Sequence, residues 1–419
     1  MFFANYVYEF SQTWDILLKY HNAVDVPEHL TLSLDAVSLA FMAHNTHSTE
    51  ANDLSRKKYV SALRMINTEL QRADSVKKAS TFEGALLLDL FEKMTKSVTE
   101  DNVPHHAHVE GALALAKLRG VETFQEGYEL KSLLGLSLNA TICCLTTTQK
   151  ISEPIRMIRE HAAKSIDVTN LNWKLSDVLM DIVDLVADIR TNTMTLEEKT
   201  ARCTKLDNCL ETISQEATPA WSYERVIVPV EHRRGLLPDD SPPLYDKYPS
   251  RAVIQTWNVL RLLRILLYEE LISHCLTPSY VANLFQPPTF TTPTIQQICA
   301  SVPHMTDCSL VASSKLPPDS PCQHSHPSSS GPSHTIPHVL DAYILIFPLY
   351  VVAWSRYCSM PTRAWVLDQL KHIATHFGIQ EADIVRDILL READTGGAEN
   401  PWYVLFRTLG AFDSLCQGL

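Results

Sequence analysis

Apolar side chains recur at the spacing of an α-helix along most of this 419-residue chain, and this periodicity constrains the fold more than any other feature. Residues 251–275 contain no Gly or Pro and are predicted to form the longest helix. The chain has 12 glycines, which disfavours glycine-rich nucleotide-binding loops and glycine-punctuated β-structure. We therefore predict an all-α fold, a multi-helix array of antiparallel amphipathic helices in one large domain. The clearest apolar stripes are Leu30, Leu34, Val37, Phe41 and Tyr59, Leu63, Ile66, Leu70.

Two segments interrupt the helical pattern. Residues 226–249 carry five prolines and few periodic apolar residues, which predicts an extended loop over the surface. Residues 313–337 are rich in Ser, Pro and His and bury too little apolar surface to offset the entropy of ordering, so a disordered insertion is predicted. The expected organisation is a helical domain over 1–312, the insertion, and C-terminal helices of the same domain over 338–419.

Charge and apolar content exclude several function classes. The formal net charge is −12, and a field of that sign opposes binding to a phosphate backbone, so direct nucleic-acid binding is not expected. The most apolar run, residues 342–354, is interrupted by Pro348. It is shorter than the roughly 20 residues that cross a bilayer, which predicts a buried helix and no membrane span.

One stretch of the sequence has the form of a family signature. It runs from His108 through Gly111-Ala112 and Leu115 to Arg119-Gly120, and Phe124 follows. In the same order along the chain lie Val37 to Phe41, Tyr59 with Ala62-Leu63, Leu86-Leu87-Leu88 with Phe91-Glu92, and Phe347-Pro348-Leu349.

This order resembles the fungal-specific transcription factor domain, the regulatory region that follows a zinc binuclear cluster in many fungal regulators, including those of sterol uptake. The resemblance spans most of residues 2–390, with 313–337 outside it. Members commonly place Trp three residues before the His, where this chain has His105, which implies local repacking. The family-signature positions are His108, Gly111, Arg119 and Gly120.

The cysteines differ from the family pattern. Ten are present, none forms a CxxC pair and none precedes Cys143, whereas family members hold two metal ions with six thiolates near the N-terminus. Because a structural zinc cluster needs closely spaced thiolates, we expect no such DNA-binding module in this sequence. Unpaired spacing predicts reduced thiols in an intracellular protein of the nucleus or cytoplasm.

Four groups of residues can be interpreted either as chemical sites or as structural residues. Four aspartates one helical turn apart could hold Mg²⁺, but an acidic solvated face is the usual alternative. His372 and His376 lie four apart, yet Ile373 stands where a zinc protease needs Glu. His105, His106 and His108 precede a helix, and Cys143-Cys144 are interpreted as buried thiols. We predict no catalytic residue, no metal and no cofactor; the aspartates are Asp177, Asp181, Asp184 and Asp188.

The Arg119-Gly120 pair has its own physical interpretation. Glycine just past a periodic run fits a left-handed helix cap, and Arg in the last turn complements the helix dipole. A ligand-anchoring role for Arg119 is the alternative.

The resemblance implies a transcription-regulator-like protein without its own DNA-binding domain. Such a protein would control fungal genes, including those of secondary metabolism, through a protein partner, which is a DNA-binding regulator or a second copy of this chain. One alternative is a receptor for a hydrophobic small molecule such as a sterol. Another is an enzyme of the isomerase or cyclase type that has evolved on this regulator scaffold.

Overall fold

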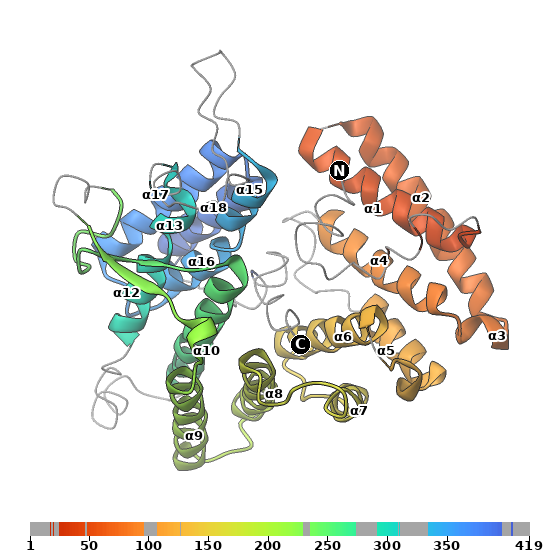
Figure 1. Ribbon diagram of the computed structural model, residues 1–419, viewed down its shortest axis with the longest axis horizontal. Coiled ribbons are helices and arrows are strands. Elements are labelled where there is room, and N and C mark those ends of the chain that lie inside the picture. The colour runs from red at the N-terminus through yellow and green to blue at the C-terminus, as the bar shows by residue number, and fades with distance from the viewer. Residues whose placement is uncertain are drawn as a thin grey trace. The chain divides into compact units, whose positions relative to one another are not determined.

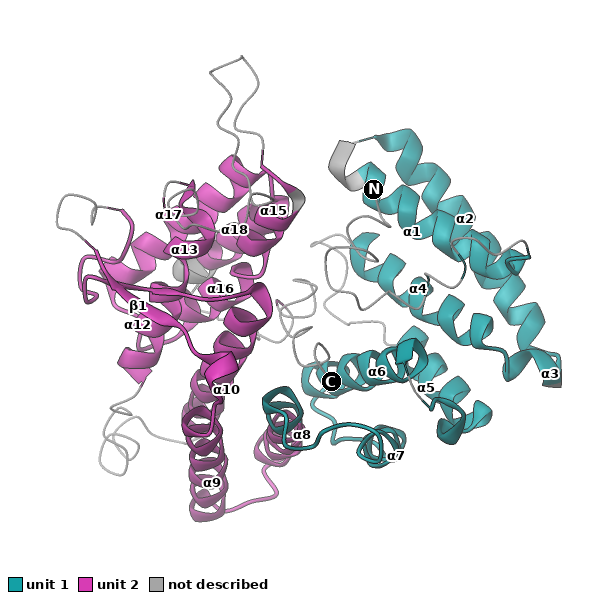
Figure 2. Cartoon of the chain, in the orientation of Figure 1, with its two compact units in different colours: residues 1–176, 415–419 teal, residues 177–414 magenta. Residues whose placement is uncertain are grey.

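The computed structural model of the chain describes residues 25–46, 48–95, 107–125, 127–228, 235–273, 291–308 and 334–395, together with Leu17, Tyr20, Leu310 and Val404. The chain forms two compact units (Figure 2). Unit 1 comprises Met1–Ser176 and Leu415–Leu419, and unit 2 comprises Asp177–Ser414. Two predicted features, His105-His106 and residues 313–333 of the insertion, lie outside the described residues.

Unit 1 is a set of helices in which α4 is central. Every residue of α4 from Ser80 to Phe91 is buried, and α4 packs against α1, α2 and α5. Helix α2 begins where the Ser48 hydroxyl accepts a hydrogen bond from the Ala51 amide at 3.2 Å, a side-chain cap. The helices are α1 Glu28–Thr46, α2 Thr49–Leu70, α3 Ala73–Val76, α4 Ala79–Thr95, α5 Ala107–Arg119, α6 Gly127–Thr146 and α7 Glu153–Ala162, with a 3-10 turn at Val121–Thr123.

Unit 2 is built around α10, Arg251–Ser273, the longest helix that the structure describes (Figure 1). The boundary between the units falls inside α8, Leu171–Arg190. Helix α9, Leu196–Gln215, begins with a capping box in which Thr195 and Glu198 bond each other's backbone amides. The remaining helices are α12 Thr291–Ser301, α13 Pro303–Thr306, α15 Ile336–Tyr343, α16 Ile346–Trp354, α17 Met360–Phe377 and α18 Gln380–Thr395, with a 3-10 turn at Pro219–Trp221.

The all-α prediction is confirmed, with one small addition. Strands β1, Glu224–Ile227, and β2, Leu244–Lys247, form the one sheet in the described part of the chain, an antiparallel pair in which Glu224 faces Lys247. The sequence predicted an extended loop over residues 226–249 and no pairing. Pro229, Pro238 and Pro242-Pro243 obscure the strand signal, but they lie outside the paired residues, where a missing amide costs no ladder bond.

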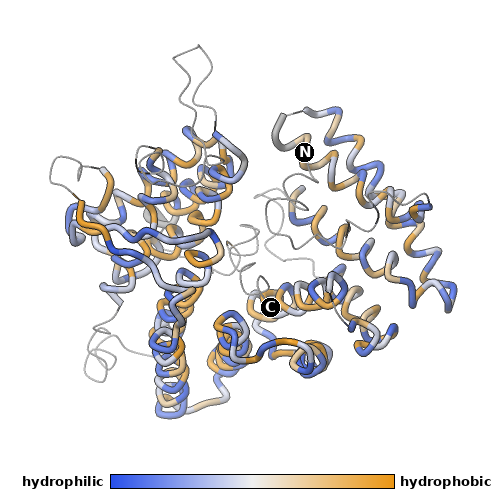
Figure 3. The backbone as a smooth tube through the Cα atoms, viewed as in Figure 1, coloured by the Kyte–Doolittle hydropathy of each residue, from blue (hydrophilic) through white to orange (hydrophobic). Residues whose placement is uncertain are grey.

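The most apolar segment of the chain belongs to the core of unit 2. Residues Pro337–Trp354 have a mean hydropathy of 1.4 and pass as a candidate membrane span by length and composition, yet 67% of this window is buried within the protein. A turn at Ile344-Leu345 separates α15 from α16, and all of α16 from Ile346 to Ala353 is buried. Burial of this kind is typical of a core helix. Figure 3 shows hydrophobic and hydrophilic residues alternating along the helices of the chain.

Candidate functional site

His108 joins three helices of unit 1 through a small hydrogen-bonded cluster. The Tyr59 hydroxyl on α2 donates to Glu92 Oε1 on α4 at 2.8 Å and lies 2.9 Å from His108 Nε2 on α5. His108 Nε2 is also 3.2 Å from the same carboxylate oxygen. Because the phenol donates to Glu92, its oxygen accepts from an Nε2 that carries hydrogen. The cluster therefore fixes how α5 lies against α2 and α4.

The environment of Tyr59 keeps its phenol neutral. Burial, and then the hydrogen bond to Glu92, raises the pKa of Tyr59 well above its usual value. Its ring stacks on Phe91 with centroids 4.5 Å apart. A neutral phenol in this position is a permanent donor to Glu92, which suits a structural contact between helices.

Arg119 is held at the corner between α5 and α6. Its Nη2 donates to Glu129 Oε2 at 2.7 Å, and its guanidinium carbon lies 4.2 Å from the centroid of the Phe124 ring. Phe124 is fully buried, meets the Phe82 ring edge-on at 5.1 Å, and its carbonyl lies 2.8 Å from His161 Nε2. An ion pair and a cation–π contact thus tie the end of α5 to the start of α6.

The two signature glycines occupy opposite environments. Gly120 has φ +92° and ψ 116°, and its amide bonds the Ala116 carbonyl at 3.1 Å, which ends α5. The positive φ agrees with the predicted cap, although ψ lies outside the left-handed helical region. Gly111 is an exposed residue inside α5, and among the described residues no atom apart from the neighbouring backbone of α5 lies within 4 Å of where its Cβ would stand.

We expect alanine at these two glycines to change the stability of unit 1 in opposite directions. Gly120→Ala forces an L side chain into positive φ and against Glu122, at a cost of about 2 kcal/mol. Gly111→Ala adds helix propensity on an open surface and stabilises by about 0.5–1 kcal/mol. Hydrogen exchange of the α5 and α6 amides measures both changes; equal effects in the two variants would contradict the assignment.

The aspartates and cysteines that the sequence singled out are in environments typical of structural rather than catalytic residues. The four aspartates lie on the face of α8 that is exposed or half-buried, and Asp188 accepts a hydrogen bond from Arg202 Nη1 at 2.8 Å. Cys143 and Cys144 are buried on α6, and burial raises the pKa of the Cys143 thiol to about 12. A thiol with that pKa is a poor nucleophile at neutral pH.

His372 and His376 lie on α17 with stacked rings whose centroids are 4.6 Å apart. The structure also brings His376 next to Cys308, a residue that the sequence analysis did not connect with it. His376 Nε2 lies 3.3 Å from Cys308 Sγ.

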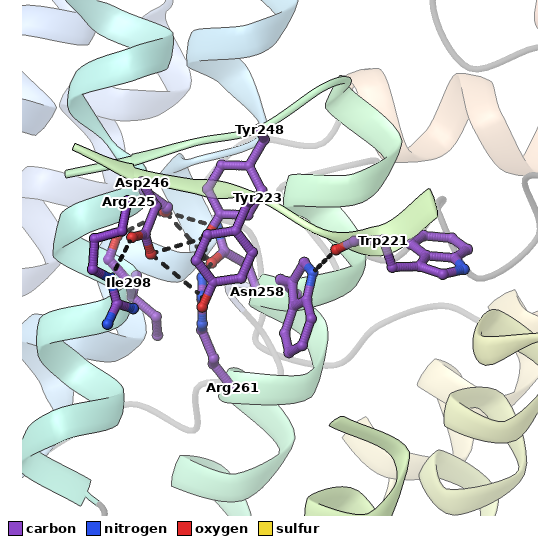
Figure 4. Close-up of polar contacts among 10 residues, drawn as sticks. Trp221, Tyr223, Arg225, Asp246, Tyr248, Asn258, Arg261 and Ile298 are labelled. Atoms are coloured by element: carbon purple, nitrogen blue, oxygen red, sulfur yellow. Dashed lines mark hydrogen bonds and ion pairs between the residues drawn. The ribbon is translucent and has the colours of Figure 1, made fainter. Parts of the chain in front are cut away.

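Unit 2 contains a buried arginine that sequence reasoning missed (Figure 4). The side chain of Arg261 on α10 is 2% exposed, and its Nη1 donates to the Tyr248 hydroxyl at 2.8 Å and to Asn258 Oδ1 at 3.0 Å. Its Nη2 lies 3.7 Å from Oδ2 of Asp246, a carboxylate that is fully buried. Tyr223, Tyr248 and Trp257 surround the guanidinium, with ring centroids 5.6, 5.9 and 5.8 Å from its carbon.

Three further contacts attach this cluster to its surroundings. Asp246 on β2 also accepts from Arg225 Nε on β1 at 3.1 Å, so one carboxylate joins both strands to α10. The Trp257 indole donates to the Trp221 carbonyl at 2.7 Å, and Asn258 Nδ2 donates to Ser301 Oγ on α12 at 3.2 Å. Burial raises the pKa of Tyr248 far above its usual value, so its hydroxyl stays protonated beside the ion pair. The arrangement fastens the β1–β2 ribbon and α12 to α10.

The missed signal lies in the burial of α10 itself. The sequence predicted a long helix here without assigning a role to Arg261, and the structure shows residues 258–263 and 265–271 of this helix all buried. A helix without a solvent face has to pair its charges inside the protein. The sequence could not predict that Tyr223, Asp246 and Tyr248 lie next to Arg261. These residues lie in or directly beside the strands of a ribbon that the sequence did not predict.

Buried His304 on α13 makes the stability of unit 2 depend on pH. Burial, with a smaller contribution from Lys247, lowers the pKa of His304 to about 4, against about 6.5 in an unfolded chain. Between about pH 6.5 and about pH 4, His304 is therefore protonated in the unfolded chain but neutral in the folded unit. The contribution of neutral His304 to the free energy of unfolding is fully present above pH 6.5. It falls as pH drops through this window, by up to about 3 kcal/mol.

We expect His304→Gln to flatten this part of the stability curve. Denaturation at pH 7, 5.5 and 4 compares the wild type with the variant, so that carboxylates titrating in both proteins cancel. Parallel curves for the two proteins would show that His304 does not carry the effect.

A comparison with protein families matches a range that contains most of the regions described above. The family model described as fungal specific transcription factor domain matches residues 16–284, more than half of the chain. The matched range includes α1 to α10, and therefore the His108 cluster and most of the Arg261 cluster. No curated protein and no solved structure matches the chain.

Proposed function

This chain belongs to the fungal-specific transcription factor domain family, and we propose that it controls transcription through contact with a protein partner. The family match is the observation that carries the proposal. Of the signature residues, His108 and Arg119 hold helices together inside unit 1.

The charge of the chain supports assigning DNA contact to the partner. A net charge of −12 repels a phosphate backbone over the distance at which charges act in solution. A partner with its own DNA-binding module supplies the positive surface. We therefore propose a DNA-binding regulator of the same family as the partner, and the nucleus as the place where the two proteins meet.

The corner between α5 and α6 has the properties of a contact surface. Leu118 is 63% exposed and Tyr128 is 45% exposed, and each is the sequence neighbour of one member of the Arg119–Glu129 ion pair. Protein interfaces are enriched in Tyr and Arg around an apolar centre. The ion pair and the Phe124 ring fix the backbone on which both side chains stand, so the surface is formed before a partner arrives.

The test compares transcripts and partner capture in a deletion strain that is complemented with wild-type or variant chain. We expect Leu118→Asp with Tyr128→Asp to abolish capture of tagged zinc-cluster regulators and to reproduce the transcript changes of the deletion. Exposed positions tolerate such changes within about 0.5 kcal/mol, so folding is retained. Val168→Asp, at a residue of unit 1 that is 46% exposed, is the matched control and should behave as wild type.

The same strains test the finer parts of the proposal. Secondary-metabolism genes are the proposed targets, and their transcripts should change in the deletion strain. An unchanged transcript profile together with turnover of a small molecule by the purified chain would establish an enzyme instead. A bound lipid in native mass spectrometry, required for the transcript response, would establish a receptor.

A further inference from the structure

A thiol and two imidazoles from two segments of unit 2 lie close together. Cys308 follows α13, His334 lies just before α15 and His338 lies in its first turn, and one ligand atom from each lies within 4.8 Å of the other two. In a tetrahedral zinc site with bonds of about 2.3 Å to sulfur and about 2.1 Å to nitrogen, the ligand atoms lie roughly 3.5 Å apart. The three ligand atoms therefore need to approach one another by no more than about 1.3 Å.

His376, near the end of α17, contacts Cys308 but lies outside the group of three whose ligand atoms are all within 4.8 Å of one another, so it becomes the fourth ligand only after its side chain moves. Its Nε2 lies 3.3 Å from Cys308 Sγ, close to the roughly 3.5 Å between sulfur and nitrogen ligands of a tetrahedral zinc ion. Its ring centroid is 4.6 Å from that of His334.

The surroundings are those that a metal site requires. His338 Nε2 lies 3.1 Å from the Met305 carbonyl oxygen, and donation to that oxygen leaves Nδ1 as the unprotonated nitrogen. The Phe377 ring stacks on His334 with centroids 4.4 Å apart and meets His338 edge-on at 4.9 Å. An apolar wall and a backbone acceptor behind a histidine keep the rings oriented and the local dielectric low.

We propose that Cys308, His334, His338 and His376 bind one zinc ion that closes the base of the segment between residues 308 and 334. Thiolate with imidazole is the donor set that favours Zn²⁺ over Mg²⁺ or Ca²⁺. Four protein ligands complete the tetrahedron, which makes the site structural. Binding releases the thiol proton of Cys308 and joins α13, α15 and α17.

The test uses the full chain, stripped of metal, kept reduced, and titrated with zinc sulfate or with cobalt(II) chloride as a spectroscopic probe. We expect one equivalent of zinc, a rise in the melting temperature of unit 2, and a cobalt spectrum with sulfur-to-metal charge transfer and tetrahedral d–d bands. Absence of stoichiometric zinc, or a cobalt spectrum without the sulfur band, would overturn the site.

The zinc affinities of single variants distinguish residues that bind the metal from residues that only lie nearby. Cys308→Ser and His338→Ala should each weaken zinc binding by more than about 100-fold, beyond the 10- to 100-fold typical of outer-shell changes. His376→Ala should weaken it as well, and unchanged affinity there would overturn the four-ligand site. Cys358→Ser, at another partly buried thiol of unit 2, is the control that keeps wild-type binding. Hydrogen exchange of metal-free variants, matching the metal-free wild type, shows that they fold.

Discussion

Replacing Arg261 with methionine is expected to destabilise unit 2 by about 3–5 kcal/mol. Methionine fills much of the same volume, so the change mainly removes the charge that faces Asp246. The Asp246 side chain is fully buried, and Arg225, its other cationic partner, is about half exposed. Without Arg261, the buried negative charge of Asp246 is balanced only by the half-exposed Arg225. A buried charge without a buried partner of opposite sign destabilises the folded state.

The size of this effect is measured locally, because two compact units need not unfold in one step. Hydrogen exchange of α10 and α12 amides reports the free energy of opening of unit 2. Asp246→Asn added to Arg261→Met should recover about 2 kcal/mol, since it removes the uncompensated charge. Arg225→Met, at the exposed end of the same cluster, should cost at most about 1 kcal/mol. A loss as large for Arg225→Met as for Arg261→Met would contradict this account.

Replacing Phe124 with alanine is expected to destabilise unit 1 by about 4 kcal/mol. The fully buried ring fills the space between the Phe82 ring and the Arg119 guanidinium, so its removal leaves a cavity and ends two ring contacts. Helices α4 to α7 should lose protection in hydrogen exchange, because Phe82 lies on α4 and the Phe124 carbonyl meets His161 on α7.

Two controls separate volume from charge at this position. Phe124→Leu keeps most of the volume and should cost about 1–1.5 kcal/mol. Arg119→Lys keeps the charge beside Glu129 and gives up the planar stacking on the ring, at about 1 kcal/mol or less. If Phe124→Ala costs no more than Arg119→Lys, the ring is not the packing centre of the corner.

Helical periodicity predicted the helices well, because each amphipathic stripe is a local signal. The predicted helix over 251–275 corresponds to α10, Arg251–Ser273. Helix α8 begins at Leu171, because the Asn170 side chain accepts a hydrogen bond from the Asn172 amide at 2.8 Å and starts the helix there. Asn before an apolar run is a capping signal, so this boundary was readable from the sequence.

Contacts between distant segments could not be predicted in the same way. The Tyr59–Glu92–His108 cluster joins residues far apart in the chain, although the signature already singled out His108. In the cluster of Cys308 with His334, His338 and His376, only His334 and His338 have a short spacing of the kind that marks a metal site in sequence. Tertiary packing brings Cys308 and His376 to this pair, so a local motif search does not find the full set.

The charges of α10 have a consequence for how unit 2 tolerates sequence change. All five charged residues of this helix have opposite-charge partners on other elements, namely Asp341, Asp246, Asp207 with Glu211, Arg356 and Arg190. Rotating α10 by one position, or sliding it by one turn, would separate these pairs together, whereas its apolar residues would find new apolar neighbours in almost any setting. Relatives should therefore exchange the apolar residues of α10 freely but change its charges only in matched pairs, such as 251 with 341.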